Sequence, residues 1–254
     1  MTASLRKNSM NDLMLLSGVD IPFPEAKISI HQPSLREISY IGEDALFRGC
    51  ELLNISKDFL TNEDKIALEN KTNFEIFMSI MMGKDLRTKE HKINVIMVLS
   101  LIFPNYEFFF ENKKIILKKE ENEYYITEKN FERFEEILKE MFCLSSETGA
   151  QKYNPVDSAA KAIAKKLKEG NEKVAKMKNE SNNKKISVYN RYVSILAVGK
   201  KKTLNEILDY TVYQLLDDFR RFELKEAHDI YIKGKLAGAE KLEEVENWMK
   251  NIHS

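Results

Sequence analysis

Histidines and cysteines are the residues in this chain whose chemistry could serve catalysis or metal binding. They stand singly in separate predicted elements, at His31, His91, His228, His253, Cys50 and Cys143. No HExxH or CxxC pattern accompanies them, and such spacing is what brings metal ligands together. Two cysteines are too few for a disulfide framework, and each lies in an apolar helical pattern typical of a buried thiol. We therefore expect no metal, no cofactor and no catalytic residue.

A pair of acids followed by a pair of arginines, Asp217–Asp218 and Arg220–Arg221, could suggest an acid pair beside a phosphate site. Adjacent residues on a helix point about 100° apart, so the two carboxylates do not converge. Asp217 instead meets an arginine three or four residues later, as in a stabilising helix pair. Neither nucleotide-binding nor acyl-transfer motifs (GxxxxGK[ST], GxGxxG, GxSxG) occur. The sequence favours a protein that is not an enzyme.

A lysine-rich segment, Lys161–Lys185, is the feature that could bind nucleic acid. It holds nine Lys and three Glu, a local charge of 9 − 3 = +6, within a chain whose 40 basic and 40 acidic residues cancel. A basic helix gains affinity for phosphates through counterion release. The segment has no arginine or aromatic residue to read bases. We expect a solvated linker helix and keep a nucleic-acid-associated accessory protein as the alternative.

Composition predicts a folded, largely helical protein. The hydrophobic fraction of 43% suffices for a core, and 9 Gly and 5 Pro in 254 residues favour long helices. The start lacks the apolar run of a signal peptide. The longest apolar run, "INVIMVLSLIF", is shorter than the ~20 residues of a membrane span, which indicates a buried helix. We expect a soluble cytoplasmic protein without a membrane partner.

Four regions follow from the patterns along the chain. Residues 1–19 are expected to form a flexible arm. Residues 20–144 predict an α+β domain: a strand signal around Ile28 and Ile30, a capping box at Ser34 and Glu37, helices, a small antiparallel meander ("YEFFF", "KIILK", "EYYIT") and a closing helix after Thr127. Residues 145–185 read as a linker with the lysine-rich helix. Residues 186–254 predict a C-terminal helical bundle with a second capping box at Thr203 and Glu206. The fold class is thus α+β and mostly helical.

Large aromatic and charged side chains gather in the C-terminal bundle. Aromatic residues and arginine carry much of the binding energy at protein interfaces, and a bundle of about 70 residues buries its large apolar groups incompletely. We therefore interpret this region as a docking module. Its expected partner-binding residues are Tyr210, Tyr213, Phe219, Arg220, Arg221, Phe222, Trp248 and Met249.

Three stretches resemble proteins encoded in the tail gene clusters of phages and prophages of Gram-positive bacteria. They are "IPFPEAKISIHQPSLREISYIGED", "YNPVDSAAKAIAKKLKEG" and "KLAGAEKLEEVENWMKNIH". The layout is similar to the long form of tail assembly chaperones, in which a linker and a smaller C-terminal domain follow the N-terminal domain. This resemblance implies a helper in the host cytoplasm that coats the tape measure protein and recruits tail tube subunits, with possible homo-oligomers. An enzyme with an unfamiliar site stays open as a further class.

Overall fold

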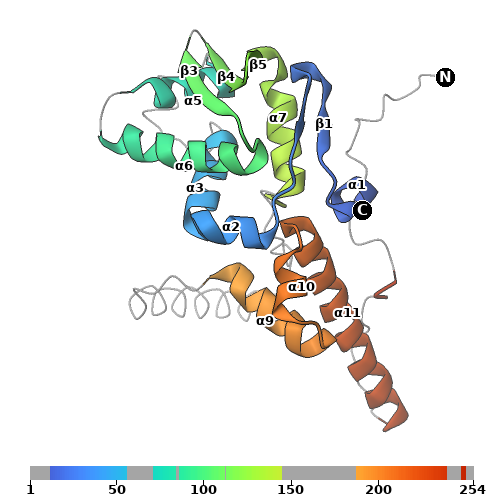
Figure 1. Cartoon of the computed structure of the whole chain (residues 1–254). Helices are drawn as coiled ribbons and strands as arrows, with labels where there is room; N and C mark the ends of the chain where they lie inside the picture. Colours follow the sequence, from blue (N-terminus) through green and yellow to red (C-terminus); the bar gives the residue numbers. More distant parts are fainter. Residues whose placement is uncertain are drawn as a thin grey trace, which may run out of the picture. The chain divides into compact units, whose positions relative to one another are not determined.

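The computed structural model describes residues 12–55, 71–83, 86–111, 113–144, 187–238 and 247–249. These residues are mostly helical and include two small antiparallel sheets (Figure 1), which confirms the predicted fold class. The described residues up to Leu144 and from Tyr189 onward belong to one compact unit. The predicted helix at Lys161–Lys185 lies outside the described residues.

A short helix and a hairpin open the described chain. Helix α1 (Asp12–Ser17) buries Leu15, so this part of the expected flexible arm is helical and packed. Strand β1 (Ile21–Phe23), the 3-10 helix η1 (Pro24–Ala26) and strand β2 (Ile28–Ile30) follow. β1 and β2 are antiparallel, and in each strand the two outer residues are buried and the central one is exposed. The sequence predicted β2 but missed β1.

Four helices follow the hairpin: α2 (Leu35–Ile41), α3 (Glu43–Leu53), α5 (Asn73–Met82) and α6 (Leu86–Ile102). The predicted capping box of Ser34 and Glu37 begins α2 and is confirmed. α3 packs closely on α6 at Gly49. A Cβ atom there would lie 2.6 Å from the carbonyl oxygen of Asn94, so this helix contact requires a residue without a side chain.

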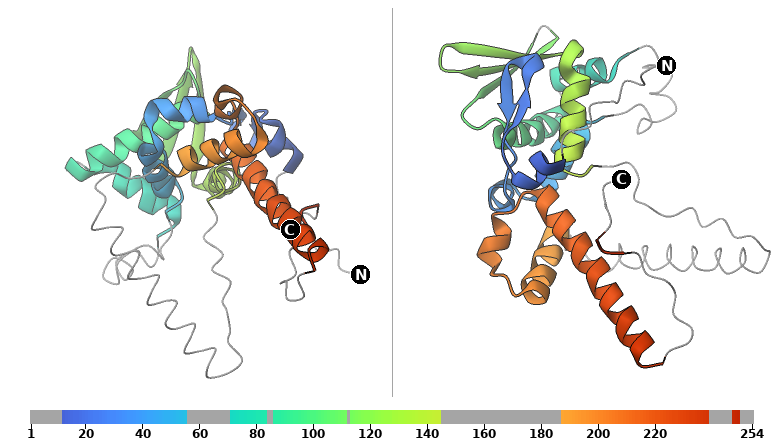
Figure 2. Two further views of the ribbon diagram at one scale, coloured as in Figure 1. Left: turned by 90° about the horizontal axis from the view of Figure 1, so that it is seen from below. Right: turned by 90° about the vertical axis from the view of Figure 1, so that its right-hand side faces the viewer.

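The predicted meander is confirmed as a three-stranded sheet in the order β3–β4–β5. β3 (Glu107–Glu111), β4 (Lys114–Lys119) and β5 (Asn122–Thr127) are antiparallel neighbours. Helix α7 (Glu128–Met141) begins directly after β5, where the backbone N–H of Thr127 donates to Oδ1 of Asn130 at 2.7 Å. The sheet lies at the periphery of its unit (Figure 2).

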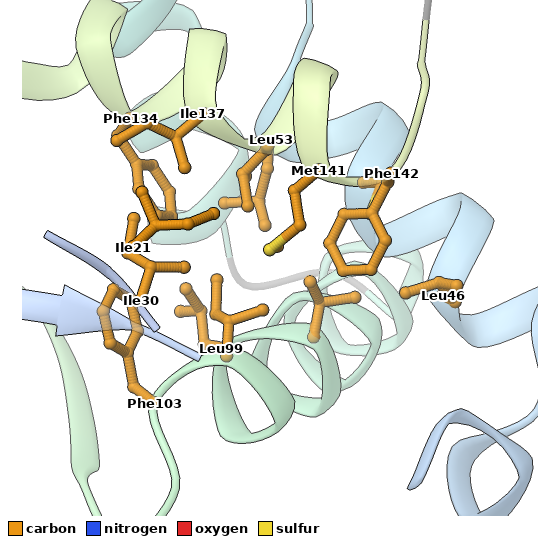
Figure 3. Close-up of a cluster of buried hydrophobic side chains, with 14 of the residues drawn as sticks. Ile21, Ile30, Leu46, Leu53, Leu99, Phe103, Phe134, Ile137, Met141 and Phe142 are labelled. Carbon is orange, nitrogen blue, oxygen red and sulfur yellow. The ribbon is translucent and has the colours of Figure 1, made fainter. Parts of the chain in front are cut away.

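Aliphatic and aromatic side chains from these elements form the core (Figure 3). α7 contributes Phe134 and Met141, which face the hairpin residue Ile30 and the α6 residue Leu99. Rings cluster at the centre, since Phe134 lies 6.0 Å from Phe23 and 6.1 Å from Phe103 between centroids. All are at most 1% exposed. The core therefore ties α6 and α7 to the N-terminal hairpin.

Three helices form the described C-terminal part: α9 (Val188–Lys200), α10 (Leu204–Leu208) and α11 (Val212–Leu236). The predicted capping box of Thr203 and Glu206 begins α10 and is confirmed. Gly199 lies in the last turn of α9, one residue before its end. A Cβ there would approach the Phe222 ring to 2.3 Å. The glycine therefore makes room for α11.

The C-terminal helices share the core of the N-terminal elements. Buried residues of α9, α10 and α11, including Leu196, Ile207 and Leu215, belong to the same hydrophobic cluster as Phe134. α11 contacts α1 and α7, and α10 contacts α2. That residues 20–144 and 186–254 are two domains that fold independently stays a prediction.

Candidate functional site

Several polar contacts join the N-terminal part of the described chain to the start of α11. The backbone N–H of Leu35 donates to the carbonyl of Tyr210 at 2.8 Å, and Ser34 forms an antiparallel bridge with Thr211. Gln214 donates from Nε2 to the carbonyl oxygen of Leu16 at 2.7 Å. These bonds hold the N-terminus of α11 against residues that lie nearly 200 positions earlier.

An ion pair and a further hydrogen bond connect exposed residues at the edge of this junction. Nε of Arg36 donates to Oδ1 of Asp209 at 2.8 Å, and its Nη2 donates to the carbonyl oxygen of Asn205 at 3.2 Å. Both charged side chains are well exposed, so the ion pair itself contributes about 1 kcal/mol or less. The contacts of Arg36 therefore contribute little to the free energy of unfolding, and their main effect is to orient α2 relative to α10.

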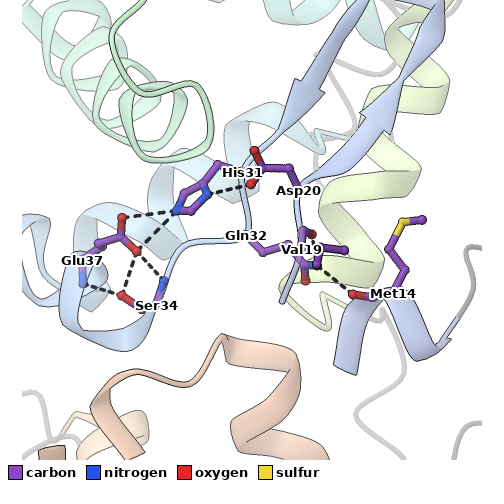
Figure 4. Close-up of polar contacts among 7 residues, drawn as sticks. All are labelled: Met14, Val19, Asp20, His31, Gln32, Ser34 and Glu37. Carbon is purple, nitrogen blue, oxygen red and sulfur yellow. Dashed lines mark hydrogen bonds and ion pairs between the residues drawn. The ribbon is translucent and has the colours of Figure 1, made fainter. Parts of the chain in front are cut away.

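His31 lies at the centre of a polar cluster beside this junction (Figure 4). Nδ1 of His31 lies 2.9 Å from Oδ1 of Asp20, and its Nε2 lies 3.2 Å from Oε1 of Glu37. His31, which directly follows β2, therefore lies between the carboxylate of Asp20 and that of Glu37 on α2.

Glu37 also receives hydrogen bonds from Ser34, through the backbone N–H at 2.8 Å and the hydroxyl at 2.7 Å. Partial burial acts to raise the pKa of Glu37, but these hydrogen bonds and the charge of His31 outweigh it and lower the pKa. The Ser34 hydroxyl donates to Glu37 and not to His31. The cluster therefore lacks the serine–base contact of a nucleophilic site and acts as a structural link.

The sequence missed this cluster, because its residues are not neighbours in the chain: Asp20 directly precedes β1, His31 directly follows β2, and Glu37 lies in α2. Asp20 and Glu37 face opposite nitrogens of the ring (Figure 4), so the three side chains do not converge on one point. Among the described residues, no group of three or more His, Cys, Asp or Glu side chains could hold a metal ion.

The acid and arginine pairs of α11 have separate structural roles. Nε of Arg221 donates to Oδ2 of Asp217 at 3.2 Å, as the i+4 spacing predicted. Asp218 instead receives a hydrogen bond from Lys200, and the Tyr210 hydroxyl lies 3.4 Å from its other oxygen. The two carboxylates therefore point to different partners, one along α11 and one toward the end of α9.

The predicted partner-binding residues divide between interior and surface. Tyr213 is buried, and burial raises the pKa of its hydroxyl above the ordinary value. Phe219 stacks on Tyr192 with 4.2 Å between ring centroids. Arg220 and Met249 remain mostly exposed, and Tyr210, Arg221, Phe222 and Trp248 are half-buried. Their role in partner binding stays a prediction, and the exposed members can reach a partner without rearrangement.

An apolar surface on α6 was not predicted. The sequence indicated a buried helix for "INVIMVLSLIF", and this is correct for one face only, since Val95, Val98 and Leu99 are buried. On the other face Ile93, Ile96 and Met97 are 54%, 37% and 36% exposed. We call these three residues the α6 surface. Their i, i+3, i+4 spacing makes one continuous stripe.

A cavity of about 410 Å³ lies along the outer side of α5. Phe74, Met78 and Met82 supply its apolar lining, and Lys71, Glu75, Ser79 and Lys113 supply polar groups. Glu75 is already engaged, because Nζ of Lys113 lies 3.3 Å from its Oε1 and the backbone of Thr72 donates to its Oε2. The lining suits an apolar side chain better than proton-transfer chemistry.

A buried carboxyl on α7 makes stability depend on pH. Burial raises the pKa of Glu135 to about 7, although the charge of Lys139 and a hydrogen bond from Asn73 act to lower it. Oε1 of Glu135 has no hydrogen-bond partner among the described residues. Between pH 4.5 and about 7 the folded state therefore holds a proton that the unfolded state has released, so stability falls as the pH rises through this window.

Glu135→Gln is expected to raise the free energy of unfolding at pH 8 by about 2 kcal/mol. One pKa unit corresponds to about 1.4 kcal/mol, which bounds the effect near 3 kcal/mol before solvent screening is considered. At pH 4 the variant and the parent should be nearly equal. Urea unfolding at both pH values measures this, with Glu121→Gln, at an exposed position between β4 and β5, as the control. Equal effects at pH 4 and pH 8 would contradict the titration of Glu135.

None of the described helices is both long enough and apolar enough to span a membrane.

Comparison with protein-family models gives a match to the C-terminal part of the chain. Residues 181–253 match the family model described as "YomV second domain", and this match points to a phage-type protein family. The matched range contains α9, α10 and α11. No match was found among curated proteins or among solved structures.

Proposed function

We propose that this protein is a non-enzymatic phage tail assembly chaperone that binds the tape measure protein and recruits tail tube subunits in the cytoplasm of the bacterial host. The phage-type family match of residues 181–253 supports the phage setting. The sequence resemblance to tail assembly chaperones supports the specific role. The observation that carries the proposal is the α6 surface, an apolar helix face that solvent reaches.

The α6 surface has the properties that an apolar helical client requires. A helix bound to a groove or to another helix is recognised through apolar residues at i, i+3 and i+4, and Ile93, Ile96 and Met97 have this spacing. No charged residue occurs between Ile93 and Phe103. The tightly packed opposite face against α3 holds the surface rigid, so little order has to be gained on binding.

Ile96→Glu combined with Met97→Glu is expected to abolish copurification with the tape measure protein. The two changes place charges at the centre of the apolar contact, and loss of an interface anchor typically costs about 2 kcal/mol or more, roughly thirtyfold in affinity. Coexpression followed by pull-down measures the effect. Val198→Glu is the matched control, because Val198 is 83% exposed on α9. Circular dichroism should show both variants folded.

Recruitment of tail tube subunits is assigned to exposed residues of the C-terminal region, Arg220 on α11 and Met249 in a turn. Arg220→Glu with Met249→Asp should weaken tube binding while tape measure binding persists. If the α6 variant keeps its client, the chaperone proposal fails. If the full-length protein instead binds only DNA and loses it in moderate salt, the Lys161–Lys185 segment gives the function.

A further inference from the structure

The free edge of the three-stranded sheet is incompletely covered. Among the described residues β3 pairs only with β4. On the inner face Ile115 and Leu117 of β4 are fully buried, whereas their cross-strand neighbours Phe110 and Phe108 on β3 stay half-buried. Phe109, on the outer face, is 45% exposed. Figure 2 (right) shows the sheet, in green, at the outer edge of its unit.

The register of β3 with β4 shows which sequence of charged and apolar residues pairs favourably with the outer face of β3. Glu107 lies opposite Lys118, Phe109 opposite Ile116, and Glu111 opposite Lys114. These pairs alternate with the inward pairs, so they share one face of the sheet. An acidic–apolar–acidic strand is thus matched by a basic–apolar–basic strand, with a favourable contact at every pair.

A second copy of β3 does not fit this edge. An antiparallel pair of β3 strands centred on Phe109 would place Glu107 of each strand opposite Glu111 of the other. A parallel pair in register would place like residues side by side. Both arrangements oppose carboxylates, and like charges directly opposite are unfavourable. The two glutamates therefore protect the edge from self-pairing, a common use of edge charges.

We propose that the free edge of β3 binds an extended segment of another protein in which Lys or Arg residues lie two positions before and after an apolar residue. The segment adds an antiparallel fourth strand, and its backbone pairs with the unused side of β3. Its basic residues meet Glu107 and Glu111, and its central apolar residue covers Phe109. The proposal is independent of the chaperone function, because the pattern of charges alone identifies the partner.

A peptide with the sequence of β4 and the preceding Lys113, Lys-Lys-Ile-Ile-Leu-Lys-Lys, serves as the probe. We expect the labelled peptide to bind the full chain in a fluorescence anisotropy titration at least tenfold more tightly than its charge-reversed form, Glu-Glu-Ile-Ile-Leu-Glu-Glu. Glu107→Lys with Glu111→Lys should invert this preference. If the lysine variant does not fold, Glu107→Gln with Glu111→Gln replaces it and leaves this face of the strand uncharged. The affinities of the two peptides for this variant should then differ by no more than about threefold, because two cross-strand charge pairs are removed.

Backbone pairing is tested separately from charge. A peptide N-methylated at both central isoleucines keeps its lysines but loses hydrogen-bond donors on either side of the strand, so we expect it to lose binding at least tenfold. Amide hydrogen exchange at Glu107–Glu111 should slow when the unmodified peptide binds. Equal binding of the methylated peptide, unchanged exchange, or a charge preference that the glutamate variants do not alter would each overturn the proposal.

Discussion

Phe134→Ala is expected to lower the free energy of unfolding by about 4 kcal/mol, because truncating a buried phenylalanine removes its transfer free energy and leaves a cavity. Phe134 is completely buried, and its ring lies about 6 Å from three others, those of Phe23, Phe103 and Phe131. These rings come from the hairpin, the end of α6 and α7 itself. Because all of them are fixed by their own elements, the cavity cannot close easily.

Urea unfolding followed by circular dichroism measures this loss. Phe109→Ala is the matched control, since it removes the same side chain from an exposed position on the sheet, and it should cost less than about 1 kcal/mol. A loss below 1 kcal/mol for Phe134→Ala would show that the rings do not form a common core.

Ending the chain at Leu144 is expected to remove at least 4 kcal/mol from the stability of the remaining part. Leu15, Leu35 and Phe142 are buried in the cluster that also contains Ile207 and Leu215 of the C-terminal helices. Each apolar side chain returned to water costs about 1.5–3 kcal/mol. The hydrogen bonds that Leu35 and Leu16 make with Tyr210 and Gln214 are lost as well.

Urea unfolding of the full chain should accordingly show one cooperative transition for the part that contains these helices. Leu215→Ala, at a fully buried position of α11, should shift the midpoint of that whole transition to a lower urea concentration. Leu204→Ala, at a position 55% exposed, should change the midpoint little. Two separate transitions, with the shortened chain as stable as the first of them, would instead support independent domains at 20–144 and 186–254.

Local signals predicted much of the fold. The capping boxes at Ser34–Glu37 and Thr203–Glu206 are side chain to backbone bonds within four residues, so the sequence alone locates these helix starts. The strands of the meander alternate in the same local way. Each of these predictions needs only residues that are neighbours in the chain.

Features that depend on distant segments could not be predicted. The exposure of Ile96 depends on which face of α6 packs against α3, and both faces are equally apolar in sequence. Nothing near Gly199 in the sequence indicates that the ring of Phe222 lies beside it. His31 resembles a lone histidine until the fold brings Asp20 and Glu37 to its two nitrogens. In each case the decisive neighbour comes from another element.

The junction between α2 and the start of α11 also determines when the core can be completed during translation. Arg36 meets Asp209, a residue 173 positions later, so α2 leaves the ribosome long before its partner exists. At about 5–20 residues per second, this interval is roughly 10–35 s. During that time Leu35 and Leu15 lack the helix that covers them. The nascent chain therefore exposes this apolar surface throughout most of its own translation, and these residues are covered only as α11 emerges.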